Sequence, residues 1–464
     1  MLKRKNTPVT AELEAGKILP LVFHLTVPAV IAQLITFLYN IVDRMYVARI
    51  EPSGMDALAA LGIVLPVTLI ISAFSNLIGL GGSPRAGIKL GEGKNETANT
   101  IFNNSFLLLI TIGILTSALA FALAEPIVRL FGCPESAVSF AVSYLRIYSA
   151  GTLFVMLAQG LNPFILTQGY SFYAMCSVLL GAVLNIALDP VFIFTLKMGV
   201  SGSALATIIS QFFSCVAVLL FFCLKRSIFR FSPKAMRLSG KIVLSIFSLG
   251  FTPFVMTITE CAIQIVFNVN LNRATGGNKD YTAVMQSALQ LISLPLNGLG
   301  TGMQPFVSYN YGRGNSKRLK EGIKIVTIIA FIFAVTIWSF SLAVPQVYAI
   351  LFSASPSVTE IVRSSAPLFL MGSVMFFVQM TLQNVNIALG QAKRALILAV
   401  MRKVVILIPL CFILTHFLGY KGVYMSEGIA DFVAGVITAI VIFSSFPKIF
   451  SEREKSVKAQ GGQS

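Results

Sequence analysis

Residues 100–124 read TIFNNSFLLLITIGILTSALAFALA and contain no charged side chain. A helix of about 20 such residues crosses the ~30 Å hydrocarbon core of a bilayer, so this stretch predicts a membrane-spanning helix. Eleven further runs have a similar length and apolar character. The twelve runs lie near residues 18–46, 58–80, 100–124, 138–164, 171–196, 200–224, 242–271, 281–307, 323–347, 360–388, 394–417 and 421–446.

The composition of the whole chain supports a membrane protein. Of the 464 residues, 56% are hydrophobic and only 11% are charged, whereas a soluble domain has about 25% charged residues. Too few charges remain to cover a water-soluble globule of this size, and a disordered chain or a disulfide-stapled scaffold is excluded on the same grounds. The spans of a membrane β-barrel would be segments of about ten residues in which polar and apolar side chains alternate. The apolar runs of this sequence do not show that pattern. The expected fold class is therefore an all-α polytopic membrane protein with twelve transmembrane helices.

The net charge of +17 suggests a nucleic-acid partner, but the distribution of the charge does not. Of the 35 Lys and Arg residues, 26 fall on one set of alternate loops and tails, four of them in the segment 393–403, and 9 fall on the other set. This bias is the positive-inside pattern of membrane proteins, whereas a DNA-binding module gathers its charge on one soluble face. We expect a multi-pass protein of the inner (plasma) membrane, surrounded by lipid, with both termini cytoplasmic and no nucleic-acid partner.

The sequence consists of two similar halves. The longest polar connection, KRSIFRFSPKAMRLSGK at 225–241, separates six apolar runs from six. Glycines and prolines recur at a nearly constant offset, in the pairs Gly91/Gly312, Gly93/Gly314, Pro134/Pro356, Gly169/Gly390, Gly199/Gly419, Gly202/Gly422 and Pro28/Pro253. Such a register indicates an internal repeat. Because each half has an even number of spans, the two six-helix lobes should be related by a pseudo-twofold axis along the membrane normal.

The repeat predicts how the chain is divided. We expect an N-lobe (1–224), a cytoplasmic linker (225–241), a C-lobe (242–446) and a cytoplasmic tail (447–464). Pro28 and Pro253 interrupt the first helix of each lobe and are candidate hinges, since proline weakens a helix.

Asp43 lies inside the first apolar run, where a charge is costly and usually has a functional reason. Thr36, Asn40 and Asp43 stand at i, i+4 and i+7 and share one helix face, which Gln33 extends by a turn. The alternative is a structural aspartate near the outer interface, paired with Arg44 or Arg49.

Asp189 has Asn185 four residues earlier on the same helix face, and Pro190 follows it. Proline removes a backbone donor, so carbonyl, amide and carboxylate oxygens gather at this point. Such hard ligands suit Na⁺, and a carboxylate alone suits H⁺, whereas the absence of soft ligands argues against a transition metal. The alternative is an aspartate that caps a broken helix.

Three further carboxylates lie in the second half. Glu260 shares a helix face with Met256, Gln264 and Phe267, a neighbourhood that suits a bulky, hydrophobic cation. The alternative is a protonated glutamate that forms one hydrogen bond to a neighbouring helix. Glu427 and Asp431 stand at i and i+4, where two carboxylates share a proton or line a hydrated vestibule.

Four motifs, taken together, resemble the multidrug and toxic compound extrusion (MATE) transporters, and among them a MepA-like bacterial branch. The motifs are YNIVD at 39–43, LGAVLNIALDPVFIF at 180–194, GSALAT at 202–207 and GMQPFVSYNYG at 302–312. Their spacing fits the twelve-helix plan, and the resemblance covers about residues 15–450.

The resemblance implies two six-helix lobes, cation-driven drug antiport and a cation site in the N-lobe. Asp43, Asn185, Asp189 and Thr207 match the family's ligands for that site, which is a Na⁺ site if the coupling ion is sodium. Glu260 matches a seventh-helix glutamate of some relatives. The chain departs from some branches in having no aspartate in its tenth apolar run, so we expect no C-lobe cation site of that type.

We therefore expect a monomeric secondary transporter that exports amphipathic, mostly cationic compounds in exchange for Na⁺ or H⁺, with no cofactor and no enzymatic activity. The coupling candidates are Asp43, Asn185, Asp189, Thr207, Asn40 and Thr36, and the substrate-binding candidates are Glu260, Met256, Gln264, Phe267, Gln33 and Tyr39. One alternative is a related flippase of lipid-linked oligosaccharides. Another is a polytopic membrane enzyme such as an acyltransferase, against which the two isolated histidines argue.

Overall fold

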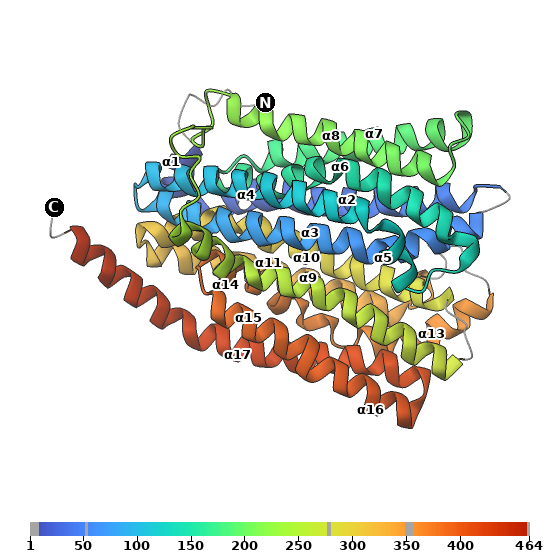
Figure 1. Ribbon diagram of the computed structural model, residues 1–464. Helices are drawn as coiled ribbons and strands as arrows, with labels where there is room; N and C mark the ends of the chain where they lie inside the picture. The colour runs from blue at the N-terminus through green and yellow to red at the C-terminus, as the bar shows by residue number, and fades with distance from the viewer. Residues whose placement is uncertain (1–8, 52–53, 276–279, 349–355, 462–464) are drawn as a thin grey trace. The chain divides into compact units, whose positions relative to one another are not determined.

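The expected runs fold as helices. The computed structural model describes residues 9–51, 54–275, 280–348 and 356–461, and this part of the chain is helical, without a strand (Figure 1). The first half comprises α1 (Val9–Ala15), α2 (Ile18–Ala48), α3 (Gly54–Gly91), α4 (Asn95–Ala122), α5 (Ala124–Leu130), α6 (Glu135–Thr167), α7 (Ser171–Pro190), η1 (Val191–Thr195) and α8 (Val200–Cys223). The second half comprises α9 (Gly240–Thr275), α10 (Asp280–Arg313), α11 (Ser316–Ala343), α13 (Pro356–Leu370), η2 (Ser373–Met375), η3 (Phe377–Leu382), α14 (Gln383–Ala388), α15 (Ala392–Val400), η4 (Met401–Leu407), α16 (Ile408–Leu418) and α17 (Tyr420–Gly461).

Each of the twelve apolar runs coincides with one helix or with consecutive helical segments. Within the described residues, ten helices are long and apolar enough to cross a membrane. An eleventh span results if Val362–Leu370 and Ser373–Ala388, which are bent by 41° at a short break, are counted as one. The remaining run corresponds to α10, a 34-residue helix that contains Pro295 and Pro305. The prediction of an all-α polytopic membrane protein is confirmed.

The chain forms two compact units whose boundaries differ from the expected lobes. One unit contains residues 31–257, and the other contains residues 1–30 and 258–464. The first part of α2 therefore groups with the second half of the sequence, and the first part of α9 groups with the first half. Both boundaries fall shortly after a proline inside the helix, Pro28 in α2 and Pro253 in α9.

Close helix contacts at two glycines, one in each half of the sequence, explain this exchange of helix ends. A Cβ on Gly81 of α3 would lie 2.3 Å from the carbonyl oxygen of Ile246 in α9. A Cβ on Gly302 of α10 would lie 2.7 Å from the Cα of Thr26 in α2. Small residues let helix backbones approach closely, so each half supplies the docking surface for the first helix of the other. The exchange could not be predicted from the sequence, because the position of a glycine does not identify the helix that packs on it.

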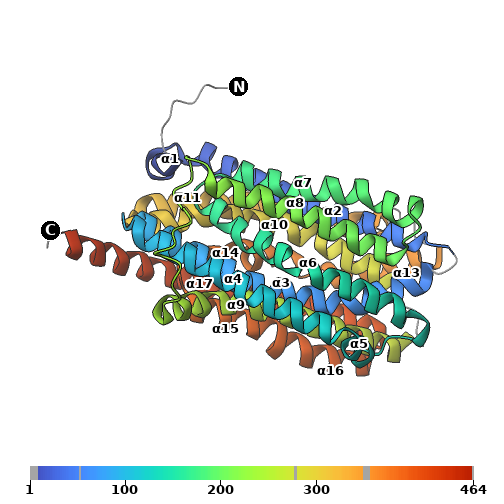
Figure 2. The ribbon, with the colours of Figure 1, turned by 45° about the horizontal axis from the view of Figure 1, so that its top comes forward.

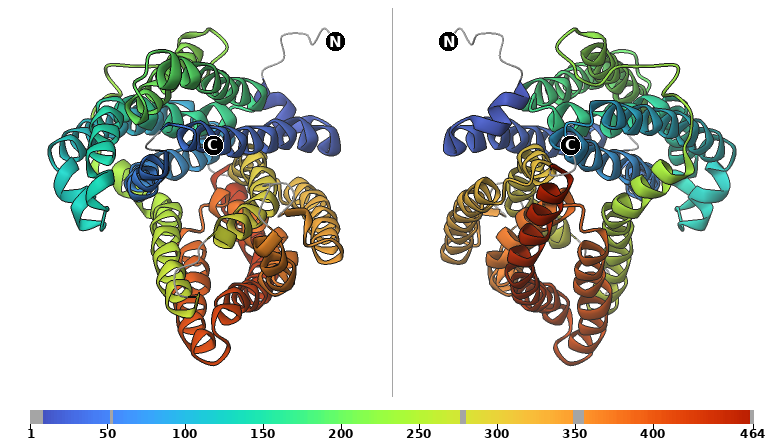
Figure 3. Two further views of the ribbon diagram at one scale, coloured as in Figure 1. Left: turned by 90° about the vertical axis from the view of Figure 1, so that its right-hand side faces the viewer. Right: turned by 90° about the vertical axis from the view of Figure 1, so that its left-hand side faces the viewer.

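Three of the repeated glycine pairs, Gly93/Gly314, Gly169/Gly390 and Gly199/Gly419, have a positive φ at both positions. Gly199 before α8 has φ +56°, and Gly419, between α16 and α17, has φ +59°. Gly93 and Gly314, at the same point of each half, both have φ +76°. Side chains with a Cβ rarely adopt this region, so the repeat preserves the turns that join consecutive helices. The turn at Gly419 connects α16 to the long α17 (Figure 3).

The segment 225–239, expected to be a linker, packs against its own unit. Phe229 is fully buried, and its ring lies 5.4 Å from the ring of Phe102 in α4. The amide side chain of Asn103 donates to the carbonyl oxygen of Arg230 (2.9 Å) and accepts from the backbone N–H of Ser232 (3.0 Å). Figure 2 shows this segment passing over the N-terminal end of α4. Hydrogen bonds to its backbone thus hold the segment in place.

We expect Asn103→Ala to loosen this segment. The substitution removes two hydrogen bonds to the linker backbone, and each buried group left without a partner costs about 1–3 kcal/mol. Trypsin should cleave the detergent-solubilised variant within 225–241 faster than the wild type. Asn95→Ala, an exposed position on the same helix, is the control, and equal cleavage rates for wild type and Asn103→Ala would contradict the role of this contact.

Two of the positive charges assigned to a cytoplasmic loop lie elsewhere. Arg402 and Lys403 were counted with the segment 393–403, but they belong to the π-helical segment η4 inside the candidate span Ala392–Leu418. They are only 7% and 6% exposed. Their side chains are held by carboxylates from other helices, which a count of charges along the sequence does not detect.

Candidate functional site

Five polar side chains from three helices form a cluster in the unit of residues 31–257. The Asp43 cluster comprises Asp43 on α2, Asn185 and Asp189 on α7, and Ser203 and Thr207 on α8. The hydroxyl of Ser203 donates to Asp43 Oδ1 (2.7 Å). Asn185 Nδ2 lies 3.5 Å from Asp189 Oδ1 and 3.4 Å from Thr207 Oγ1. The structure therefore brings together the four residues that the family resemblance assigns to a cation site.

The carboxyl groups of Asp43 and Asp189 lie within hydrogen-bonding range of each other. Asp189 is completely buried and Asn185 is 3% exposed. Among the described residues, neither Asp189 Oδ2 nor Asn185 Oδ1 has a hydrogen-bond partner. Two negative carboxylates at such range repel each other strongly when they are buried, unless a proton or a cation joins them. The cluster is thus an oxygen-rich site suited to one small cation.

The local sequence explains how α7 and α8 meet at this point. Pro190 ends the regular helix, and the chain continues as the π-helical turn η1 over Val191–Thr195. Gly202 of α8 packs directly on this turn, where a Cβ would lie 2.7 Å from the carbonyl carbon of Phe192. This approach places Ser203 and Thr207, one turn apart on α8, beside α2 and α7.

Ser203 and two tyrosines at the cluster were missed by the sequence analysis. Tyr144 of α6 contacts Thr207 through its side chain, and its ring lies 6.2 Å from that of Tyr148, nearly parallel. Both tyrosines are 7% exposed. The available signal was the i, i+4 spacing of Ser203 and Thr207 and of the two tyrosines, which on a single helix resembles ordinary packing.

Of the polar helix face of α2 that carries Thr36, Asn40 and Asp43, only Asp43 is placed in the Asp43 cluster. Thr36 Oγ1 donates to the carbonyl oxygen of Ala32 (2.9 Å), and Asn40 Nδ2 donates to that of Thr36 (2.8 Å). These hydrogen bonds stay within the helix. Tyr39 lies within electrostatic range of Asp43, and Gln33 is half-buried. The coupling role of Thr36 and Asn40 and the substrate role of Gln33 and Tyr39 stay predictions.

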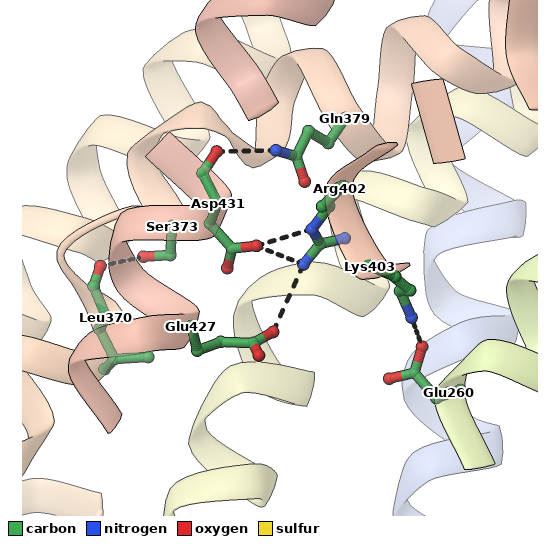
Figure 4. A network of polar contacts seen from close by, with 8 residues as sticks. All are labelled: Glu260, Leu370, Ser373, Gln379, Arg402, Lys403, Glu427 and Asp431. Atoms are coloured by element: carbon green, nitrogen blue, oxygen red, sulfur yellow. Dashed lines mark hydrogen bonds and ion pairs between the residues drawn. The ribbon is translucent and has the colours of Figure 1, made fainter. Parts of the chain in front are cut away.

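A second polar cluster lies in the other unit (Figure 4). Arg402 donates from Nε (2.7 Å) and Nη2 (2.5 Å) to Asp431 Oδ1, and Nη2 lies 3.6 Å from Glu427 Oε1. Gln379 Nε2 donates to the backbone oxygen of Asp431 (2.7 Å). The ammonium group of Lys403 contacts the carboxylate of Glu260. We call Glu260, Gln379, Arg402, Lys403, Glu427 and Asp431 the Arg402 network.

The carboxylate of Glu260 has a charged neighbour that the expected hydrophobic site did not include. Its carboxylate forms an ion pair with Lys403, which the sequence analysis assigned to a loop. Phe267 is 1% exposed, Met256 falls in the other compact unit, and the side chain of Gln264 lies outside the described part of the structure. The substrate role of these four residues stays a prediction.

Sequence comparison identifies relatives along most of the chain. Residues 28–191 and 253–413 match the family model MatE. The multidrug export protein MepA of Staphylococcus haemolyticus is 27% identical over 438 residues, covering 93% of this chain and 94% of the relative. MepA of Staphylococcus saprophyticus is 27% identical over 436 residues, covering 90% and 92%.

Solved structures share the fold. An outward-facing multidrug resistance MATE family transporter of the MOP superfamily superimposes with a TM-score of 0.89 at 23% identity, covering 96% of this chain and 99% of that chain. A MATE structure in a bent conformation gives a TM-score of 0.88 at 23% identity, covering 98% and 100%. At this level of identity these structures show the fold alone.

Proposed function

Because this chain belongs to the MatE family, whose members are membrane transporters and not enzymes, we propose that it exports amphipathic, mostly cationic small molecules in exchange for Na⁺ or H⁺. Multidrug efflux is supported by relatives named as multidrug export proteins along more than nine-tenths of the chain. The alternative of a lipid-linked oligosaccharide flippase is not favoured by these relatives.

The observation that supports cation coupling is the pair of carboxyl groups in the Asp43 cluster. Two facing carboxyls, with two buried oxygens that no group among the described residues satisfies, favour a state in which a cation is bound. Binding of a proton needs only the carboxyl groups, whereas binding of Na⁺ also uses the oxygens of Asn185 and Thr207. Neither cation needs a cofactor. In either case the transported cation is a substrate of the protein.

Antiport requires that cation and drug favour different conformations. The cluster contains Asp43 of α2, a helix that contains Pro28 and whose two parts belong to different compact units. A cation bound between Asp43 and Asp189 changes the charge that α2 presents to α7 and α8. We propose that this change biases α2 at Pro28, with Pro253 as the corresponding hinge in α9.

The proposal also includes the oligomeric state, the location and the partners of the protein. The protein acts as a monomer in the plasma membrane with both termini in the cytoplasm. It binds no nucleic acid and needs no cofactor other than the cation that it transports.

The experiment is ethidium efflux from proteoliposomes under an imposed pH gradient or an imposed Na⁺ gradient, each alone. Asp43→Asn should lower the driven efflux of every substrate, cationic or neutral, because each transport cycle needs the cation step. We expect a loss on the order of tenfold or more in driven rate, equivalent to ~1.4 kcal/mol in cation affinity. Loss of cationic substrates alone would place Asp43 in the drug site and contradict the proposal.

A further inference from the structure

The Arg402 network holds an unequal number of opposite charges. Glu260, Glu427 and Asp431 supply three carboxylates, whereas Arg402 and Lys403 supply two positive groups. The side chains of Arg402, Glu427 and Asp431 are 9%, 7% and 0% exposed, and that of Lys403 is 8% exposed. A buried charge is costly unless it is paired, so the two bases cannot satisfy all three acids at once.

Arg402 is committed to the acids of α17. Its guanidinium makes two short hydrogen bonds to Asp431 and lies close to Glu427, and it also lies over the ring of Phe376, 5.4 Å from the centroid. Asp431 Oδ2 and Glu427 Oε2 remain without a hydrogen-bond partner among the described residues. The rigid fork of an arginine is suited to such a fixed position.

Lys403 lies within reach of acids on two different helices. Its ammonium group contacts Glu260, and it also lies within electrostatic range of Glu427 and Asp431. A lysine has a flexible four-carbon stem and a compact charge, and it is carried here by the π-helical segment η4; such segments often occur at functional sites. One ammonium group thus stands between acids on α9 and on α17.

Glu260 is the member that a ligand can reach. Its side chain is 52% exposed, whereas the other charged side chains of the network are exposed by less than a tenth. A cation that approaches the Arg402 network from its exposed side therefore meets Glu260 first. It competes with Lys403 for the carboxylate of Glu260.

We propose that Lys403 is a built-in counter-ion of Glu260 which a cationic substrate displaces, so that Lys403 sets how strongly the protein selects cationic over neutral compounds. When the substrate's positive charge pairs with Glu260, the ammonium group moves to Glu427, whose second oxygen is unsatisfied. The charge of the network is then better balanced than before. This inference rests on the proposed export function and names the group that tunes its substrate selectivity.

Removing the competitor should strengthen the binding of cations. In Lys403→Met we expect ethidium to bind on the order of tenfold more tightly, whereas the affinity for the neutral dye Nile red stays unchanged. In Lys403→Arg the bidentate guanidinium holds Glu260 more firmly, so ethidium should bind several-fold more weakly, with Nile red again unchanged. The second variant keeps the positive charge and preserves the test if the first does not fold.

A double-mutant cycle identifies the partner of Lys403. In the Glu260→Gln background, Lys403→Met should no longer improve ethidium binding, because the carboxylate for which the two cations compete is absent. Lys421→Met and Glu360→Gln, at exposed positions in the same unit, are matched controls that should leave both dyes unaffected.

The measurement is equilibrium binding of each dye to the purified full-length protein in detergent, at fixed pH and without an ion gradient. Unchanged or weaker ethidium binding in Lys403→Met would overturn the proposal, as would an equal change for both dyes or the same gain in the Glu260→Gln background. Because no gradient is used, failure here is distinct from failure of cation-driven efflux in the Asp43→Asn experiment.

Discussion

Asp189→Asn is expected to lower cation-driven efflux by about a hundredfold or more while the protein stays folded. A hundredfold loss corresponds to ~2.8 kcal/mol in cation affinity. The carboxyl of Asp189 is completely buried and interacts with that of Asp43, so in the proposed cation site it supplies half of the negative charge. An asparagine keeps the size of the side chain but can neither gain nor lose a proton.

The fold should tolerate this change for a specific reason. The amide oxygen of asparagine can still accept from Asn185, and the new NH₂ group can donate to Asp43, which faces it. Folding is checked by size-exclusion chromatography of the purified variant, and efflux by ethidium release from proteoliposomes. Asp56→Asn, in which the side chain still accepts from Ser136, is the control. Near-normal driven efflux by a folded Asp189→Asn variant would remove the basis for a cation site here.

Arg402→Met is expected to destabilise the protein strongly. Removing one partner of a buried ion pair costs ~3–5 kcal/mol because the remaining charges are left unpaired. Glu427 and Asp431 would both lose their ion pair with Arg402. Lys403 cannot replace Arg402 without giving up its ion pair with Glu260. We expect a lower yield of monodisperse protein and a lower melting temperature in detergent.

A second substitution separates charge from packing in this prediction. Arg402→Met combined with Asp431→Asn should recover most of the lost stability, because the carboxylate that pairs most closely with Arg402 is then neutral. Arg363→Met, at an exposed position on α13, is the control and should melt like the wild type. A single variant as stable as the wild type, or a double variant no better than the single one, would show that the ion pairs do not hold this unit together.

The helices and the repeat could be predicted from the sequence because their signals are local. A run such as 100–124 is apolar whatever its neighbours are, and Gly199 and Gly419 occupy equivalent turns with φ near +60°. The exchange of the first parts of α2 and α9 between the compact units could not be predicted. It depends on which backbone each of Gly81 and Gly302 touches.

The site was predictable where one helix face carried the signal. Asn185 and Asp189 share a face of α7, and their position beside Pro190 indicated an oxygen-rich site. Thr207 was found only through the family resemblance, and Ser203 was missed because a serine among small residues resembles helix packing. Arg402 and Lys403 were misplaced because they were grouped with Lys393 and Arg394 at the start of the run 394–417. Two positive residues inside an apolar run are not expected in a span until their acidic partners on α9 and α17 are known.

Reversing the direction of coupling tests the central claim most directly. In proteoliposomes with no ion gradient, an outward ethidium gradient is imposed, and the return flux of the cation is recorded, H⁺ with an entrapped pH dye in Na⁺-free buffer and Na⁺ with radioactive sodium at fixed pH. If the protein is an antiporter coupled at Asp43 and Asp189, ethidium leaving the vesicles drives one of these cations inward, and Asp189→Asn abolishes that flux. Ethidium movement through the protein with no opposite flux of either cation would contradict cation-coupled antiport.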